Sequence, residues 1–453
     1  MISDEADAHD GLRPYRAGFF FAFFNGFTWL VVLGTPMILL AEELGASPFV
    51  VGLCYAFVFL LLPFQILATT VTPRVGYKRQ AVFCWAVRGF FILPPLGLAI
   101  WQPESGNLWA IAILAVSIFF FCLFRAMGSM VVPAWLYDML PENLQGRYFS
   151  TDFTVIGFCG VFTLILCAAC FLFFDTYTAI LLQYGLAIFG AIAATIALSR
   201  LPSAPNPPPS SMMNILKAAP RLVLREPKYR YYLCLNASYF ALTSAAYPFF
   251  SYYLKREMGI GYVPILYFTA LQHFGGFIAA SLLRQRIDKM DIRIPFWVAI
   301  LLNLINGIFW ILIMSGFTDL VYLSPFLFPL VGAAGSCYIS ANFKYLPQLM
   351  SASDRPLGIA LQTTIVGVIT GIASTALGGI LRGEGGVFLN DRFGIYLVFM
   401  LGIQLFLAVL FYKLKRSDTG ESVPLPFGSW LNRPFRAMAA TPLFRRPQEK
   451  RDE

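Results

Sequence analysis

Long apolar runs dominate this sequence and restrict its fold more than any other feature. A spanning α-helix needs about 20 predominantly apolar residues. The chain contains twelve such segments, at about 17–41, 48–70, 80–101, 108–136, 148–174, 177–199, 231–254, 263–283, 293–315, 320–344, 356–381 and 393–414. Only 13% of its residues are charged, against about 25% in an average soluble domain. The sequence therefore predicts an all-α integral membrane protein with twelve transmembrane helices.

One long polar break, RLPSAPNPPPSSMMNILKAAPRLVLREPKYR, divides these segments into two sets of six. Its first part is rich in Pro and Ser and cannot form a membrane helix. We therefore expect a linker between two membrane-embedded bundles. The predicted organisation is an N-terminal segment (1–16), a six-helix bundle (17–199), the linker (200–230), a second six-helix bundle (231–414) and a basic tail (415–453).

The two sets of segments resemble each other weakly. LPENLQGRYFSTDFTVIG, from Leu140, aligns without a gap with MSASDRPLGIALQTTIVG, from Met350. Both place a polar turn before a helix that opens with Ser or Thr. Internal repeats of this kind are common in transporters, so the two bundles are expected to be pseudo-symmetric.

The distribution of basic residues predicts the orientation of the chain. Lys and Arg collect on the cytoplasmic face of polytopic proteins. By the boundaries above, 27 of the 33 Lys and Arg residues lie on the face that carries both termini, and four lie on the opposite face. Both termini of this multi-pass cell-membrane protein are therefore expected in the cytoplasm. Topology accounts for the net charge of +9 without nucleic acid; the basic tail either contacts anionic lipid or is simply solvated.

The loop after the second segment reads TTVTPRVGYKRQ from Thr69. It resembles the pattern G-x-x-x-D-R-x-G-R-[RK] of the major facilitator superfamily, with matches at Arg74, Gly76 and Lys78. Twelve segments, a central linker and both ends on one side extend the resemblance over almost the whole chain. It implies that these three residues control gating between the halves; the alternative is that the cations only set orientation. Pro73 stands where the family has an Asp that helps to hold the two halves together on the cytoplasmic side. Either another group of this chain holds the halves together there, or their contact on that side is weak.

The resemblance also implies which segments line a solute cavity. In the superfamily, helices 1, 4, 7 and 10 line it, helices 2, 5, 8 and 11 flank it, and helices 3, 6, 9 and 12 stay outside. The expected substrate-binding residues are the polar ones at membrane depth on these helices: Asn25, Trp29, Arg125, Asn236, Tyr239, His273 and Gln362. The alternative for each amide or hydroxyl is a hydrogen bond between helices. His273 is the candidate carrier of a coupling proton near neutral pH.

Two arginines lie inside predicted segments. Arg88 is about 12 Å from its segment's start at 1.5 Å per residue, close enough to snorkel to the cytoplasmic surface, and it is interpreted as structural. Arg125 is deeper. No Asp or Glu lies near mid-depth, which argues against exporters that hold cationic drugs on such a carboxylate. Three partners for Arg125 stay open: Asp152, a backbone carbonyl, or an anionic group of the solute held by two parallel hydrogen bonds.

These features predict a secondary active or facilitative transporter that moves a small solute, such as an organic anion or another polar metabolite, by alternating access. The alternatives are a sugar-like permease for uncharged solutes or, from other classes, a polytopic membrane enzyme or a non-transporting sensor. An enzyme would need a cluster of acidic and His residues, whereas the chain has two His, and no G-x-x-x-x-G-K-[ST] motif for ATP is present. We expect no enzymatic activity.

All eight Cys fall in apolar segments, where they are expected to pack between helices. No metal or cofactor is expected. The expected partners are the solute, the lipid bilayer and a coupling proton or ion, and the protein is expected to be a monomer.

Overall fold

The computed structural model of the chain describes residues 12–129, 131–206, 220–283, 287, 290–350, 355–381 and 389–414. Every regular element in these ranges is a helix, which confirms the all-α prediction. Eleven helices or consecutive helix pairs among the described residues are long and apolar enough to cross a membrane. The predicted tail from 415 lies outside the described residues.

The first half contains ten helices that make up six spans. They are α2 (Arg16–Val32), α3 (Thr35–Glu43), α4 (Pro48–Leu60), α5 (Phe64–Val75), α6 (Tyr77–Phe90), α7 (Leu93–Trp101), α8 (Leu108–Ser129), α9 (Val131–Met139), α10 (Glu142–Phe173) and α11 (Thr176–Ser199). The short 3₁₀ helix η1 (Arg13–Tyr15) precedes them. Three of the breaks lie beside prolines, at Pro36, Pro63 and Pro94, because proline lacks the N–H that would continue the preceding helix.

The second half contains six longer helices. They are α13 (Pro227–Arg256), α14 (Tyr262–Leu283), α15 (Arg293–Met314), α16 (Ser324–Tyr345), α17 (Arg355–Leu381) and α18 (Leu389–Tyr412), with the 3₁₀ turns η2 (Thr318–Leu323) and η3 (Leu346–Leu349). α13 corresponds to the seventh predicted segment, 231–254. It is the one predicted segment missing from the eleven apolar spans, because it is too polar. Its polar residues are compatible with membrane depth because much of the helix, including Asn236 and Tyr239, is buried against its neighbours.

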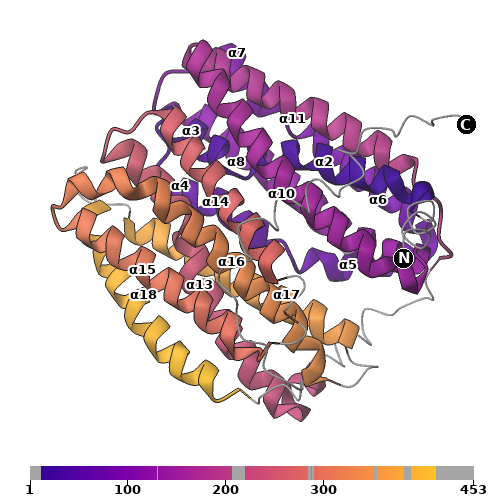
Figure 1. Cartoon of the computed structure of the whole chain (residues 1–453). Helices are drawn as coiled ribbons and strands as arrows, with labels where there is room; N and C mark the ends of the chain where they lie inside the picture. Colours follow the sequence, from indigo (N-terminus) through magenta and orange to yellow (C-terminus); the bar gives the residue numbers. More distant parts are fainter. Residues whose placement is uncertain are drawn as a thin grey trace, which may run out of the picture.

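The two halves lie side by side, with α2–α11 in indigo to magenta and α13–α18 in red to yellow (Figure 1). The contacts between them run through α3 and α4 on one side and α13, α14 and α17 on the other, and α10 packs along α14. α4 and α17 approach closely through glycine: a Cβ on Gly378 would lie 2.7 Å from the carbonyl oxygen of Pro48. Small residues allow membrane helices to pack this closely.

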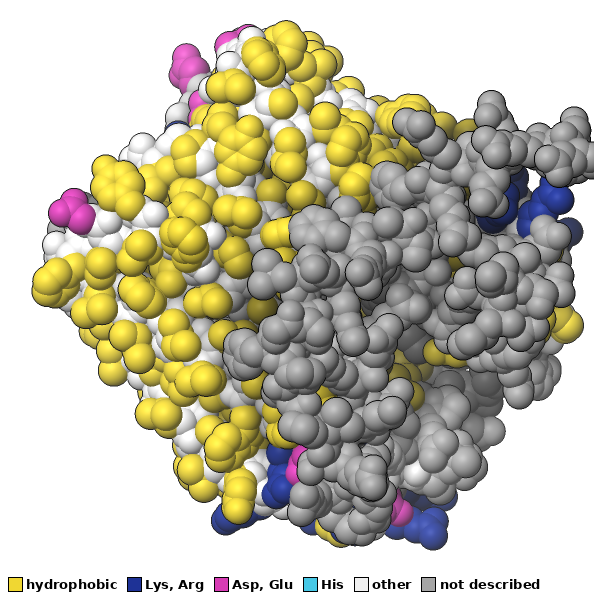
Figure 2. Space-filling model, in the orientation of Figure 1, with side chains coloured by type: hydrophobic (Ala, Val, Ile, Leu, Met, Phe, Trp, Pro, Cys, Tyr) yellow, Lys and Arg dark blue, Asp and Glu magenta, His cyan; other side chains and the backbone are white. Residues whose placement is uncertain are grey.

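The surface of the bundle is a broad hydrophobic band (Figure 2). Exposed side chains such as Phe189, Phe326 and Phe399 contribute to it, as expected of helices that face lipid. Acidic side chains appear at the upper left of this face and beside basic ones at the lower edge, and further basic side chains lie at the right. We call the end of the bundle that carries Arg74, Lys78 and Lys344 the basic end, and the opposite end the Glu43 end.

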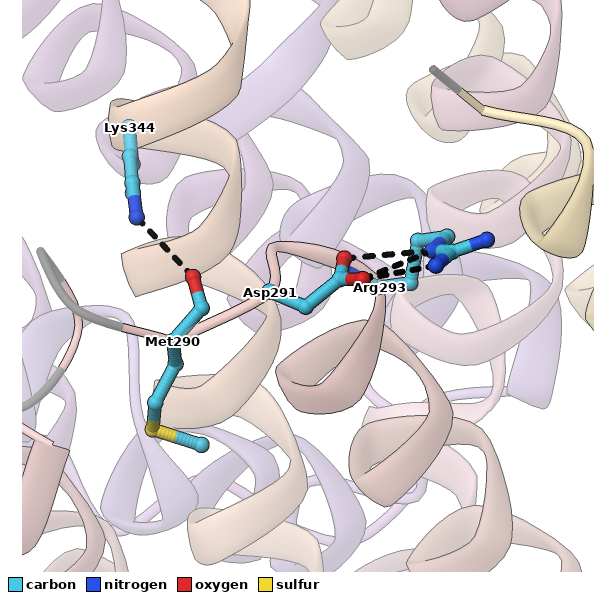
Figure 3. Close-up of polar contacts among 4 residues, drawn as sticks. All are labelled: Met290, Asp291, Arg293 and Lys344. Carbon is cyan, nitrogen blue, oxygen red and sulfur yellow. Dashed lines mark hydrogen bonds and ion pairs between the residues drawn. The ribbon is translucent and has the colours of Figure 1, made fainter. Parts of the chain in front are cut away.

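Arg293 and Lys344 make polar contacts at the basic end of the second half (Figure 3). Arg293 and Asp291, at the start of α15, form an ion pair with an N–O distance of 2.7 Å. Lys344, at the end of α16, donates to the carbonyl oxygens of Ile287 at 2.5 Å and Met290 at 3.1 Å. The side chain of Lys344 thus ties α16 to the connection between α14 and α15.

Candidate substrate-binding site

Arg125 lies on α8 in the interior of the first half. Its Nη1 donates to the carbonyl oxygen of Val58 on α4 at 3.2 Å, and its guanidinium carbon lies 4.2 Å from the centroid of the Trp29 ring on α2. The side chain is partly exposed. A guanidinium has five N–H donors, so this single hydrogen bond leaves most of them available. Arg125 and Trp29, two of the predicted substrate-binding residues, thus lie in contact, and their binding of a solute stays a prediction.

Arg88, on α6, is held differently. Its Nη2 donates to Asn25 Oδ1 at 2.5 Å, and its guanidinium lies 4.9 Å from the Trp85 ring and 4.8 Å from the Phe121 ring. Trp85 Nε1 donates to the same Asn25 oxygen at 3.1 Å. Arg88 is 1% exposed. It therefore does not snorkel to the surface, because Asn25 and two aromatic rings stabilise its cation inside the bundle.

No carboxylate neutralises either arginine in the part of the chain that the structure describes. The ion pair found there is Arg293–Asp291, at a helix end. Arg125 is hydrogen-bonded to a carbonyl rather than to Asp152, and it acts on Arg88 electrostatically by repulsion. The hypothesis of an Arg125–Asp152 ion pair is thus not supported, and the interior of the first half carries two uncompensated positive charges.

The interior of the second half is polar but uncharged. Asn236 donates from Nδ2 to Asn342 Oδ1 at 3.3 Å and accepts from the hydroxyl of Tyr338 at 2.9 Å. Tyr239 stacks on Tyr338 with ring centroids 3.6 Å apart and accepts from Asn303 Nδ2 at 2.8 Å. Both predicted substrate residues on α13 are buried here. Their polar groups join helices of the same half, which is the alternative stated for such residues.

Several side chains join the halves. Thr35 and Thr269 share a hydrogen bond of 2.9 Å, and the hydroxyl of Tyr262 donates to Glu43. Tyr55 on α4 stacks on Tyr247 on α13, with centroids 5.8 Å apart. The two halves thus contact each other through hydroxyls, phenol rings and a carboxylate, from the Glu43 end toward the middle of the bundle.

The two remaining predicted substrate residues lie on α14 and α17. His273 packs against α10, since a Cβ on Gly160 would lie 3.1 Å from His273 Nδ1. The imidazole is therefore at the interface between the halves. Gln362 is buried on α17, and the structure does not bring it into contact with Arg125.

The predicted gating residues contact the first half and the start of the linker. Gly76 has φ +86°, and a Cβ there would lie 2.8 Å from Asn206 Oδ1; glycine adopts this conformation without strain. Lys78 Nζ donates to the carbonyl oxygen of Leu201 at 2.8 Å. Arg74 is exposed. All three line a cavity of about 310 Å³ that Asn206 helps to close.

Sequence reasoning left a backbone carbonyl open as a partner of Arg125 without identifying which one, and it missed the hydrogen-bond partner of Arg88. The carbonyl of Val58 carries no sequence signal, because every residue has one. The spacing of Trp85 three residues before Arg88 is a signal for a ring beside the cation, since residues three apart lie on one helix face. Asn25 was expected at the substrate, but its side-chain oxygen is occupied by Arg88 and Trp85.

The comparison with known proteins places the chain in a family. The sequence model of the Major Facilitator Superfamily matches residues 18–333, so the chain belongs to this superfamily, which confirms the resemblance. It is a small-solute transporter. The search among curated proteins found no match.

Transporters of different solutes have solved structures with the same fold as this chain. A mutant of the nucleoside transporter NupG superposes with a TM-score of 0.69 at 12% identity, over 88% of this chain and 99% of that chain. A D-xylose-proton symporter gives 0.67 at 14%, over 90% and 98%. A peptide transporter in complex with sulfate gives 0.66 at 14%, over 88% and 94%. At these identities the likeness shows the fold alone.

Proposed function

We propose that the protein transports a small organic anion by alternating access and that Arg125 binds its carboxylate or phosphate group. The observation that carries this proposal is a partly exposed arginine inside the bundle, whose guanidinium makes one hydrogen bond and has no carboxylate partner among the described residues. An arginine at the centre of a membrane helix costs about 2.5–3.5 kcal/mol on insertion scales. An anionic solute would offset this cost and leave the site when transport is complete.

The surroundings of Arg125 support anion binding over a purely structural role. Arg88 adds a second positive charge close by, and the low dielectric of the bundle strengthens its effect on any anion. Trp29 supports the guanidinium plane from one face, which leaves its edge available for two parallel hydrogen bonds to a carboxylate or phosphate. The related structures are transporters of nucleosides, xylose and peptides, so the fold alone does not select the solute.

The transport cycle follows from how the halves meet. α5 packs on α6, α8 and α9 of its own half, whereas α3 and α4 pack on α13, α14 and α17. The halves are thus joined toward the Glu43 end, and the solute would exchange from the basic end, which the charge distribution assigns to the cytoplasm. Rocking of the halves would break the Thr35–Thr269 and Glu43–Tyr262 contacts. His273, at the α10–α14 interface, is the proposed carrier of a coupling proton.

Flux measurements in liposomes test this proposal. Purified protein is reconstituted and assayed with radiolabelled succinate, malate and glycerol 3-phosphate, with xylose and uridine as uncharged competitors. Arg125→Lys keeps the charge but loses the planar fork, so anion uptake should fall severalfold while the protein still inserts. Arg256→Lys, at the exposed end of α13, is the matched control and should transport normally. Uptake of xylose or uridine, but of no anion, would overturn the proposal.

A further inference from the structure

A small cavity lies among α13, α14, α15 and α16, and Arg125 does not line it. Four aromatic side chains and two amides line it: Tyr247, Phe250, Trp310, Phe328, Gln272 and Asn306. Its volume is about 10 Å³, close to the roughly 10–15 Å³ that one water-sized group requires. The cavity thus has room for a single hydroxyl-sized group.

Asn306 is the unusual residue in this cavity. It is 4% exposed, and its Oδ1 has no hydrogen-bond partner among the described residues. A buried amide oxygen without a donor costs about 1–3 kcal/mol, and most buried polar atoms in native structures have a partner. By contrast Asn303, one turn earlier on α15, donates to Tyr239. Asn306 therefore presents an acceptor to the cavity that none of the described donors in its wall satisfies.

The cavity borders the interface between the halves. Tyr247 forms part of its wall and stacks on Tyr55 of the first half. The Tyr247 hydroxyl lies close to the side chains of Gln272, also in the wall, and Thr35, across the interface. Movement of Tyr247 as the halves rock would connect the cavity with the space between them.

We infer that Asn306, with Gln272 and Tyr247, binds a hydroxyl group of the transported solute. This inference rests on the proposed function and specifies the substrate class: a small carboxylate or phosphate that also carries a hydroxyl. A hydroxyl fits the cavity and donates to Asn306 Oδ1. An ammonium group fits less well, because none of the residues that line the cavity is acidic and an unpaired buried charge is costly.

The test compares two pairs of anions that differ only in hydroxyl groups: malate with succinate, and glycerol 3-phosphate with propyl phosphate. Ligands that bind the folded state raise the melting temperature, and titration calorimetry gives each Kd. In the wild type the hydroxylated member of at least one pair should bind about fivefold to tenfold more tightly, the factor of one neutral hydrogen bond. Asn306→Leu should abolish this difference and leave the affinity for the deoxy member unchanged.

Gln404→Leu is the matched control. Gln404, on α18, is also a fully buried amide without a partner among the described residues, but it does not line the cavity. Both Leu variants should keep or raise the melting temperature without ligand, because each removes an unsatisfied buried polar group. Only Asn306→Leu should change the preference for the hydroxyl.

The possible outcomes separate this inference from the proposed function. If both members of each pair bind equally to the wild type, the hydroxyl site is wrong and the anion site stands. If neither pair binds, the substrate class stated here is wrong. If Asn306→Leu lowers the melting temperature without ligand and leaves the hydroxyl preference intact, Asn306 is structural and the inference fails.

Discussion

The two halves of this transporter share a fold but differ in the chemistry of their interiors. The first half holds two cations in its interior, the buried Arg88 and the partly exposed Arg125, among aromatic rings and amide or carbonyl oxygens. The second half buries neutral phenols and amides that bond to one another, from Asn236 through Tyr338 and Tyr239 to Asn303. Among the described residues, its charged side chains lie at helix ends. Pseudo-symmetry of the backbone thus does not extend to charge.

This difference in charge assigns the two halves different roles in solute recognition. Under the proposed function, the first half with its two arginines selects the anionic group, and the neutral second half recognises the uncharged part of the same solute. The helix breaks follow the same division, since prolines interrupt spans of the first half, whereas α13 and α16 continue through Pro248 and Pro329. The predictions below test whether each interior has the role assigned to it.

The largest effect is expected from removing charge in the first half. Arg125→Gln should weaken binding of the transported anion about 10- to 100-fold, because hydrogen bonds to charged groups contribute about 1.5–3 kcal/mol. Calorimetry on purified protein measures the change. Gln362→Leu, a buried amide of the second half, serves as the comparison. Equal losses for the two variants would contradict a division of charge recognition between the halves.

Breaking the support of Arg88 should reduce stability rather than affinity. Asn25→Leu removes the oxygen that accepts from Arg88 and Trp85, and it leaves a buried cation without its hydrogen bond. The free energy of unfolding should fall by about 1.5–3 kcal/mol, measured by denaturant unfolding in detergent micelles. Unchanged stability together with weaker anion binding would show that Asn25 contacts the solute directly.

The neutral network should respond more weakly. Tyr239→Phe keeps the ring that stacks on Tyr338 but removes the acceptor of Asn303 Nδ2. The free energy of unfolding should fall by about 1 kcal/mol, and anion affinity should not change. A loss of affinity at unchanged stability would restore Tyr239 as a substrate-binding residue, as the sequence suggested.

The sequence predicts the fold far better than the site, for physical reasons. Segment length and the excess of basic residues at one end are properties of composition, and lipid imposes them on every helix. Whether an intramembrane amide faces a solute or another helix depends on rotation and packing, which the sequence does not encode locally. Asn236 and Asn306 are both amides within apolar segments of the sequence. The structure gives hydrogen bonds to both the nitrogen and the oxygen of Asn236, whereas the oxygen of Asn306 has no partner among the described residues.

A smaller effect is expected at the basic end of the first half. Lys78→Met removes the hydrogen bond to the Leu201 carbonyl, which joins the start of α6 to the chain after α11. We expect slower flux at unchanged anion affinity, because Lys78 lies outside the bundle interior. Lys344→Met removes the corresponding tie of the second half, to Ile287 and Met290, and a comparison of the two flux rates shows which half limits the cycle. A large loss of affinity in Lys78→Met would contradict the gating role.

The smallest effect is expected from the linker that joins the two halves. Leu201 is buried, Trp135 donates to the carbonyl oxygen of Pro202 at 3.1 Å, and Asn206 donates to the carbonyl oxygen of Pro73 at 3.5 Å, so the start of the linker docks on the first half. Replacing residues 202–211 by a Gly/Ser run of equal length keeps the carbonyl at position 202 and the reach of the tether. Insertion and liposome flux should therefore stay near normal. Loss of flux at normal expression would mean that side chains in 202–211, such as Asn206 beside Gly76, dock specifically, and that the halves are coupled through the linker as well as through their interface.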